Sequence, residues 1–200
     1  MSGLVGAIVA GGAAARFGGA PKGLHRVGGT RIIDRVAAAL RAVTPELMII
    51  SNASDASQWL PDIPVHADVR PERGSLIGIH TALTHASGDA MVVAWDLPFV
   101  SPDLLRLIRD RARGGAEAVF PEGPSGAEPF CALYTRACLP VIESAIDAGE
   151  LRLSDIVARL HRRHVISIGE IARLGDPARL LFNVNSPADL ARAEAIDATR

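Results

Sequence analysis

Two cations lie in a glycine-rich stretch near the start of the sequence. The segment GAIVAGGAAARFGGAPKG covers residues 6–23 and places Arg16 and Lys22 among six glycines. Glycine lets backbone N–H groups come close to phosphate oxygens, and two cations would neutralise part of the phosphate charge. The pattern indicates phosphate recognition; a flexible turn that carries two solvated cations is the alternative.

Two well-known phosphate motifs do not match this stretch. Lys22 is followed by Gly23, which excludes a P-loop, and no GxGxxG follows the first apolar run directly. Instead, Gly11 and Gly12 come immediately after the apolar run 4–10. The stretch is therefore expected at the carboxyl end of a buried strand, where α/β folds bind their ligands.

A carboxylate follows the most apolar segment of the chain. Asp96 comes directly after AMVVAW, residues 90–95. A carboxylate at the end of a buried strand is costly without a partner, and Mg²⁺ is bound by one or two carboxylates together with phosphate oxygens and waters. The sequence predicts a metal ligand at Asp96; an aspartate that caps the following turn is the alternative.

The elements that would position these residues alternate between strand and helix along the chain. Apolar runs predict strands at 4–10, 46–51, 63–67, 90–95, 116–120, 128–135 and 164–168. Helical spacing predicts helices at 31–43, 54–60, 75–86, 136–148, 152–161 and 185–195, and one that begins at Pro102 with Ser101 as its cap. This alternation predicts an α/β sandwich of three layers, with a mainly parallel sheet covered by helices on both faces.

Composition restricts the function further. A chain of 200 residues that is 48% hydrophobic fits one domain over 1–200. With 21 Lys and Arg against 22 Asp and Glu, the formal charge of -1 gives no basic field for nucleic acid. Cys131 and Cys138 form no disulfide framework, and the run 4–10 is too short to span a membrane. We expect a cytoplasmic protein without nucleic-acid or membrane partners.

The glycine-rich loop resembles the signature GG-x3-R-x-G-x3-K of nucleotidyltransferases. The chain is similar to the molybdenum cofactor guanylyltransferase family, also called molybdopterin-guanine dinucleotide biosynthesis protein A, over nearly its full length. Further blocks follow in the order seen in that family: GSLIGIHTAL (74–83), WDLPFVSPDLL (95–105), EPFCALY (128–134), GELRLSDIVARL (149–160) and FNVNSPADLARAE (182–194). The resemblance implies a Rossmann-like fold of the nucleotide-diphospho-sugar transferase type.

The family resemblance implies GMP transfer from GTP to the terminal phosphate of molybdopterin, with release of pyrophosphate. Lys22 would hold the α-phosphate, Arg16 the β- and γ-phosphates, and Asp96 the Mg²⁺. Transient contact with other molybdenum cofactor proteins is compatible with this role. The nucleotide-binding residues that the resemblance implies are Val9, Ala10, Gly11, Gly12, Lys22, Asn52, Asp68 and Asp96.

The resemblance assigns the remaining polar candidates to the two substrates. Asn52 matches a base-contacting asparagine and Asp68 a nucleotide-site aspartate, although a turn-closing Asn and a solvated loop carboxylate are the alternatives. Asn183 and Asn185 would share one side of an extended segment and face the pterin substrate. Alternatively, Asn185 or Ser186 merely caps the helix that follows.

The chain departs from the family pattern in two places, and two other functions stay open. Glu128-Pro129 stands where many members have His-Pro, and Pro21 stands where many have Asp. An enzyme of the same fold could use another nucleotide or acceptor, as in cytidylyl transfer to molybdopterin or activation of a sugar or polyol phosphate. A nucleotide-binding regulatory module without turnover is the other alternative.

Overall fold

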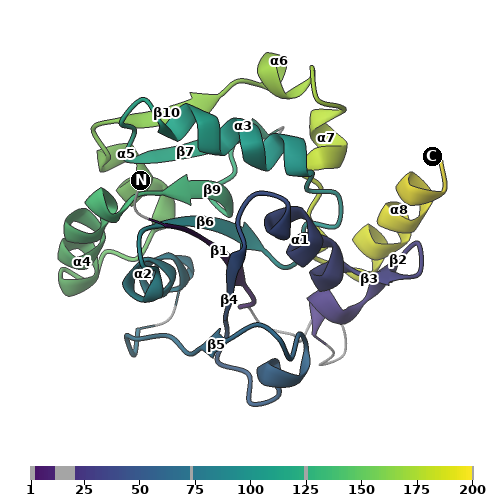
Figure 1. Ribbon diagram of the computed structural model, residues 1–200, viewed down its shortest axis with the longest axis horizontal. Helices are drawn as coiled ribbons and strands as arrows, with labels where there is room; N and C mark the ends of the chain where they lie inside the picture. The colour runs from purple at the N-terminus through teal and green to yellow at the C-terminus, as the bar shows by residue number, and fades with distance from the viewer. Residues whose placement is uncertain (1–2, 12–20, 73, 124–125, 200) are drawn as a thin grey trace.

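A twisted sheet forms the centre of the molecule, between two layers of helices (Figure 1). The computed structural model describes residues 3–11, 21–72, 74–123 and 126–199. In the sheet, the strands run in the order β10-β7-β9-β6-β1-β4-β5, and β8 pairs with β7 outside this path. Their bounds are β1 Leu4–Val9, β4 Glu46–Ile50, β5 Val65–His66, β6 Asp89–Ala94, β7 Ala118–Gly123, β8 Gly126–Ala127, β9 Cys131–Tyr134 and β10 Arg163–Ile166.

Strand β1 lies in the middle of the sheet and runs parallel to both of its neighbours. Its last residue, Val9, pairs with Ile50 of β4 and with Ala94 of β6, so the three strands end at one edge. Strand β9 is antiparallel to both β6 and β7. Because β9 runs opposite to β6 and β7, its first residues lie at the end of the sheet where β6 finishes. The predicted mainly parallel sheet is confirmed, with β9 and the short β8 as the antiparallel exceptions.

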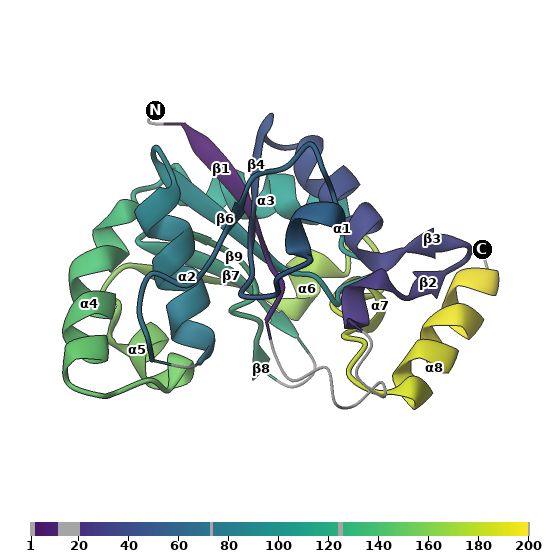
Figure 2. The same ribbon diagram turned by 90° about the horizontal axis from the view of Figure 1, so that it is seen from below.

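The helices divide between the two faces of the sheet. Figure 2 shows α2 (Ser75–His85), α4 (Leu139–Asp147) and α5 (Leu153–Arg159) on one side, and α1 (Ile32–Arg41) on the other side. Helix α3 (Pro102–Ala112) packs in the same apolar cluster as α1. Strand residues alternate between the two clusters: Ile8 belongs to the α1 cluster, whereas Ala7 belongs to the α2 cluster. Burial on both faces explains why the strands read as continuous apolar runs.

Side-chain caps fix the starts of several helices, among them α3 and the C-terminal helix. Ser101 Oγ accepts a hydrogen bond from Leu104 N at 3.2 Å at the start of α3. Ser186 Oγ accepts one from Asp189 N at 3.2 Å at the start of α8 (Pro187–Ala198). Both helices carry Pro in their first turn, where a missing N–H is harmless. The predicted cap of α3 is confirmed, and Ser186 is the cap of α8.

Several short elements differ from the sequence prediction. The expected helix at 54–60 is a 3-10 turn, η3 (Ala56–Gln58), and another such turn, η4 (Arg136–Cys138), precedes α4. The strand expected at 164–168 ends at Ile166, because Ser167 forms a capping box with Glu170 and starts α6 (Ile168–Ile171). Helix α7 (Pro177–Leu180) and the hairpin of β2 (Arg26–Val27) and β3 (Thr30–Arg31) were not predicted. In that hairpin, Gly28 and Gly29 have φ of +57° and +78°, as a tight two-residue turn requires.

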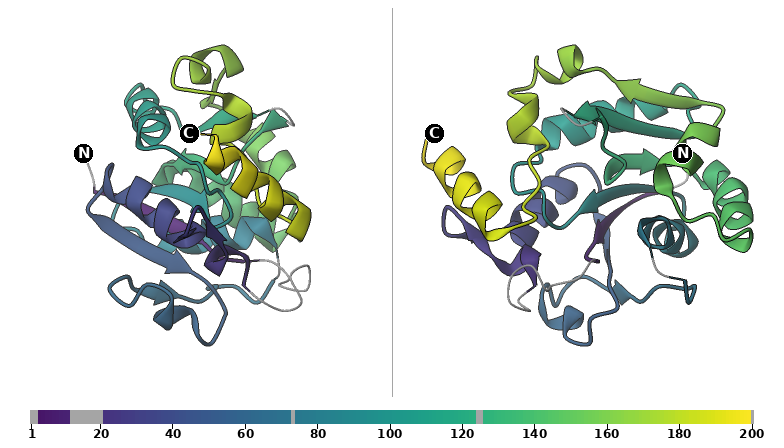
Figure 3. Two further views of the ribbon diagram at one scale, coloured as in Figure 1. Left: turned by 90° about the vertical axis from the view of Figure 1, so that its right-hand side faces the viewer. Right: turned by 180° about the vertical axis from the view of Figure 1, so that it is seen from behind.

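Helix α8 is fastened to α1 and to the turn of the β2–β3 hairpin. Arg35 donates to both carboxylate oxygens of Asp197, at 3.0 and 3.1 Å. The backbone N–H of Gly28 donates to Glu194 Oε2 at 3.1 Å. Figure 3 shows the yellow α8 beside the purple hairpin from behind. No helix among the described residues is long and apolar enough to cross a bilayer.

Candidate active site

The ends of three neighbouring strands form the floor of a cavity of about 880 Å³. Ala10 N donates to Ile50 O at 2.9 Å, and Trp95 N donates to Val9 O at 3.2 Å, so the residues after β1, β4 and β6 stay aligned. Gly12 and Arg16, which the sequence also predicts for the site, lie outside the described residues. The predicted residues that line the cavity are Val9, Ala10, Gly11, Asn52, Asp68, Asp96, Asn183 and Asn185.

Lys22 links two of these residues. It belongs to a 3-10 turn, η2 (Lys22–Leu24), and is 8% exposed, as is Asp96. Its ammonium Nζ donates to Asp96 Oδ2 at 2.9 Å and to Asn185 Oδ1 at 3.0 Å. The structure thus brings Lys22, Asp96 and Asn185 together from three distant parts of the chain.

The segment 183–185 is held against the end of β6 by its backbone. Val184 N donates to Asp96 O at 2.9 Å, and the Val184 side chain is fully buried. Asn183 and Asn185, on either side of it, both line the cavity. Asn185 N donates to Asp189 Oδ2 at 3.1 Å in the first turn of α8. The predicted shared orientation of the two asparagines is therefore what the structure shows, and Asn185 does not cap the helix.

Asp96 has the chemistry of a metal ligand. Its Oδ2 accepts from Lys22, and among the described residues no hydrogen bond reaches its Oδ1. Carboxylate oxygens are the ligands that Mg²⁺ prefers. The described residues contain no group of three or more His, Cys, Asp or Glu that could hold a metal ion. A cation at Asp96 would therefore need further oxygen ligands from a bound phosphate or from water.

Asn52 and Asp68 form a reciprocal pair beyond β4 and β5. Asn52 Nδ2 donates to Asp68 Oδ2 at 2.7 Å, and Asp68 N donates to Asn52 Oδ1 at 2.9 Å. Both amide atoms of Asn52 are thereby oriented, and the two side chains lie at the end of the cavity nearest the sheet edge β5. The pair presents a fixed carboxylate to a ligand on that side.

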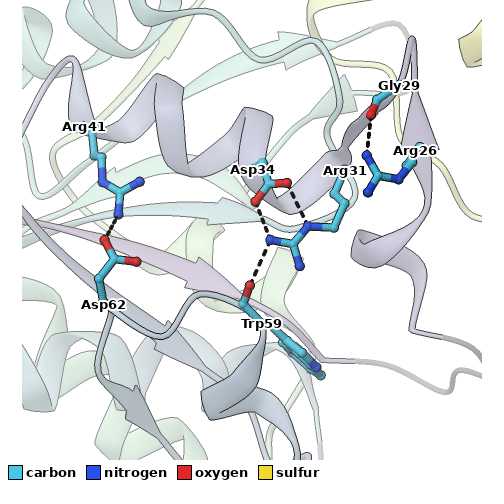
Figure 4. Close-up of polar contacts among 7 residues, drawn as sticks. All are labelled: Arg26, Gly29, Arg31, Asp34, Arg41, Trp59 and Asp62. Atoms are coloured by element: carbon cyan, nitrogen blue, oxygen red, sulfur yellow. Dashed lines mark hydrogen bonds and ion pairs between the residues drawn. The ribbon is translucent and has the colours of Figure 1, made fainter.

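Sequence reasoning missed an aromatic support beneath Lys22. Trp95, which precedes Asp96, lies against Gly23: a Cβ atom built on Gly23 would come within 2.6 Å of the Trp95 ring. Trp95 stacks on Trp59 with ring centroids 4.9 Å apart. Arg31 donates to Trp59 O at 3.0 Å and to both oxygens of Asp34, which holds the η3 segment in place (Figure 4). The signal in the sequence was a tryptophan next to Asp96 and a glycine after Lys22.

Glu128 also lines the cavity, although the sequence indicated it only as a departure from the family pattern. Burial raises the pKa of its carboxyl group and the charge of Asp96 adds to this effect, whereas a side-chain hydrogen bond from Asn183 opposes it. Glu128 reaches this edge because β9, which it precedes, is antiparallel to β6.

Comparisons with known proteins identify the family and support the fold. A relative, the molybdenum cofactor guanylyltransferase of Desulfosudis oleivorans, is 33% identical over 198 residues, which is 98% of this chain and 96% of the relative. The crystal structure of molybdopterin-guanine dinucleotide biosynthesis protein A from Archaeoglobus fulgidus has a TM-score of 0.83 and 26% identity, and covers 98% of this chain and 100% of its own. The predicted fold class is confirmed.

A third comparison concerns the fold alone. A protein from Mycobacterium tuberculosis, solved as a complex with manganese, has a TM-score of 0.65 at 19% identity and covers 97% of this chain and 98% of its own. The model of the MobA-like NTP transferase domain matches residues 6–165. By this match and by its full-length relatives, the chain belongs to the MobA-like NTP transferase family.

Proposed function

We propose that the chain is a molybdenum cofactor guanylyltransferase, which transfers GMP from GTP to molybdopterin. An oxygen of the acceptor's terminal phosphate attacks the α-phosphorus of GTP. The bond from that phosphorus to the oxygen bridging to the β-phosphate breaks, and pyrophosphate leaves. The observation that carries the proposal is the Lys22–Asp96–Asn185 cluster, buried at the strand ends where α/β folds bind ligands.

Lys22 has the free hydrogen-bonding capacity that phosphate binding requires. An ammonium group has three N–H donors, and Asp96 and Asn185 use two of them. No residue in the described part of the chain takes up the third donor, which would bind an α-phosphate oxygen without loss of the other contacts. At about 4 Å, two like unit charges repel by about 4 kcal/mol at an effective dielectric constant near 20, so an anionic acceptor needs such cations to reach a triphosphate. Arg16 would add a second cation at the β- and γ-phosphates.

We assign Mg²⁺ to Asp96, whose Oδ1 atom accepts no hydrogen bond from the described residues. When bound, the ion supplies charge neutralisation on the nucleotide phosphates. The residues of this chain do the rest by positioning: Lys22 holds Asp96 in place, and the hydrogen bond from Val184 N to Asp96 O fixes the acceptor-side segment beside it. No covalent enzyme intermediate is needed.

The two substrates would lie on opposite sides of Asp96. Asn52 and Asp68 follow β4 and β5, so they support the nucleoside of GTP. Asn183 and Asn185, on the other side, support molybdopterin. We also propose that residues 1–200 act as one domain in the cytoplasm, with transient contact to other molybdenum cofactor proteins; the free, buried Cys131 and Cys138 support a reducing compartment.

The test is pyrophosphate release with each of the four NTPs, with molybdopterin as acceptor and Mg²⁺ present. We expect kcat/KM for GTP to exceed the values for CTP and ATP by at least about tenfold, since a site that hydrogen-bonds one base edge leaves groups unpaired with another. Equal use of CTP in competition would favour cytidylyl transfer. Release with a sugar phosphate but not with molybdopterin would overturn the acceptor assignment.

A further inference from the structure

The cavity contains a carboxylate that the proposed reaction does not yet use. The carboxylates among the described lining residues belong to Asp68, Asp96 and Glu128. Asp96 pairs with Lys22, and Asp68 hydrogen-bonds Asn52. Glu128 has no ion-pair partner within the described part of the chain. A charged group without a cation, inside a substrate cavity, points to a ligand that donates hydrogen bonds.

The position of Glu128 follows from its backbone contacts and from the glycine beside it. Its backbone is fixed on both sides, because Glu128 N donates to Pro121 O and Cys131 N donates to Glu128 O, both at 3.0 Å. The carboxylate lies over Gly123, where an added Cβ would come within 2.8 Å of Oε1. The carboxylate thus packs directly over the bare backbone of residue 123, where a side chain would force it to shift.

Glu128 lies far from Asn52, the residue proposed to support the nucleoside, along the row of strand ends that forms the cavity floor. Asn52 follows β4 and Glu128 precedes β9, and β1 and β6 lie between these two strands. At about 4.8 Å per strand, three steps place the two ends of the cavity on the order of 14 Å apart. The nucleoside on Asn52 and a ligand on Glu128 therefore flank the phosphates at Asp96 from opposite sides.

The chemistry of the Glu128 carboxylate restricts the class of ligand that it can bind. It would repel the phosphate of the acceptor, so the part of the acceptor that faces it must be uncharged. Its two oxygens accept hydrogen bonds from two adjacent N–H groups in one plane. A pterin ring carries such a pair, the ring N3–H and the neighbouring 2-amino group.

We propose that Glu128 determines acceptor specificity by accepting hydrogen bonds from the N3–H and 2-amino groups of the pterin. This inference rests on the proposed function, because it takes molybdopterin as the acceptor.

The test is equilibrium binding of 6-hydroxymethylpterin, followed by its fluorescence. The comparison ligand is 6-hydroxymethyllumazine, which has an oxygen in place of the 2-amino group. We expect the parent protein to bind the pterin at least about tenfold more tightly than the lumazine. Glu128→Gln should weaken pterin binding about tenfold, change lumazine binding little, and leave the KM for GTP unchanged. Glu122→Gln, an exposed neighbour on β7, is the matched control and should behave as the parent.

Three outcomes overturn one of the two proposals and distinguish them. If the parent binds the pterin and Glu128→Gln binds it equally well, Glu128 does not contact the pterin. If Glu128→Gln keeps pterin binding but weakens Mn²⁺ binding to the GTP complex, measured by electron paramagnetic resonance, Glu128 is a metal ligand instead. If the parent neither binds the pterin nor transfers GMP to molybdopterin, the proposed function itself fails. Melting temperatures near that of the parent confirm that each variant is folded.

Discussion

Gly23→Ala tests whether the Trp95 ring positions Lys22. An added Cβ would come within 2.6 Å of Trp95 Cε3 and 2.7 Å of Cδ2, where ordinary contact begins near 3.4 Å. The ring cannot retreat, because Trp95 is 5% exposed and stacks on Trp59, which is 4% exposed. The turn η2 must therefore move away from the ring by about 1 Å, and Lys22 moves with it.

The size of the effect follows from that displacement. Overpacking of this kind costs about 1–3 kcal/mol, which for a chain of this length lowers the melting temperature by about 2–12 °C. Lys22 Nζ contacts Asp96 and Asn185 at 2.9 and 3.0 Å, so a 1 Å shift breaks both hydrogen bonds. A misplacement of about 1 Å lowers the rate by about a hundredfold. We expect kcat to fall by that factor, with a smaller change in GTP binding.

The assay is pyrophosphate release under saturating GTP and acceptor, with thermal unfolding measured on the same preparations. Gly169→Ala in α6 is the matched control, since no heavy atom lies within 4 Å of its added Cβ and its φ is not positive. In a double-mutant cycle, Gly23→Ala should cost less when Trp95→Leu is present, because the smaller side chain leaves room. A Gly23→Ala protein with the kcat and melting temperature of the parent would refute the reasoning.

Three further predictions concern charges. Lys22→Ala should lower kcat about a hundredfold, which corresponds to about 3 kcal/mol in the activation free energy. It should also lower the melting temperature more than Asp96→Asn does, because it leaves a buried carboxylate without its cation. Equal melting temperatures of the two variants would contradict the stability argument. Asp96→Asn keeps an acceptor for Lys22 but should abolish Mg²⁺ uptake by the GTP complex in isothermal titration, and uptake as in the parent would place the metal elsewhere. Burial and the charge of the stacked His85 lower the pKa of His66, so the folded state disfavours its charged form and stability is lost as the pH falls below about 6.5. His66→Gln should therefore reduce the difference in melting temperature between about pH 7.5 and about pH 5.5, and an unchanged difference would remove His66 as its cause.

The frame of the fold follows from local patterns. The runs 4–10 and 90–95 are apolar throughout because both faces of β1 and β6 are covered. Such a run can be recognised in the sequence without knowing which elements pack against the strand. The start of α3 can be predicted in the same way, because the Ser101 cap and Pro102 act within the first turn of the helix. The short elements could not be predicted in this way. Residues 54–60 form only a 3-10 turn, because tertiary contacts such as the one between Arg31 and Trp59 O decide that segment.

The candidate site was predictable in its residue types but not in its contacts. Lys22 and Asp96 were identified from loop spacing and from a carboxylate after a buried strand. That they form one ion pair, shared with Asn185, depends on segments up to 163 positions apart in the sequence. The role of Glu128 depends on the reversed direction of β9, which an apolar run does not reveal. Arg16, outside the described residues, stays a prediction.

Helix α8 has little buried surface, so we expect it to unfold locally at a lower cost in free energy than the strands of the sheet. Within α8, Ala193 is the one buried residue among those described, so the contacts of Asp197 with α1 and of Glu194 with the hairpin do much of the anchoring. Elements with little buried apolar surface open locally at a small cost in free energy while the rest of the protein stays folded. Such an opening would carry Asn185 away from Lys22 and dismantle the acceptor side without disturbing β1 or β6. Substrates that bind only when α8 is folded against the hairpin would stabilise the folded helix. Binding in the cavity should therefore reduce the local unfolding of α8.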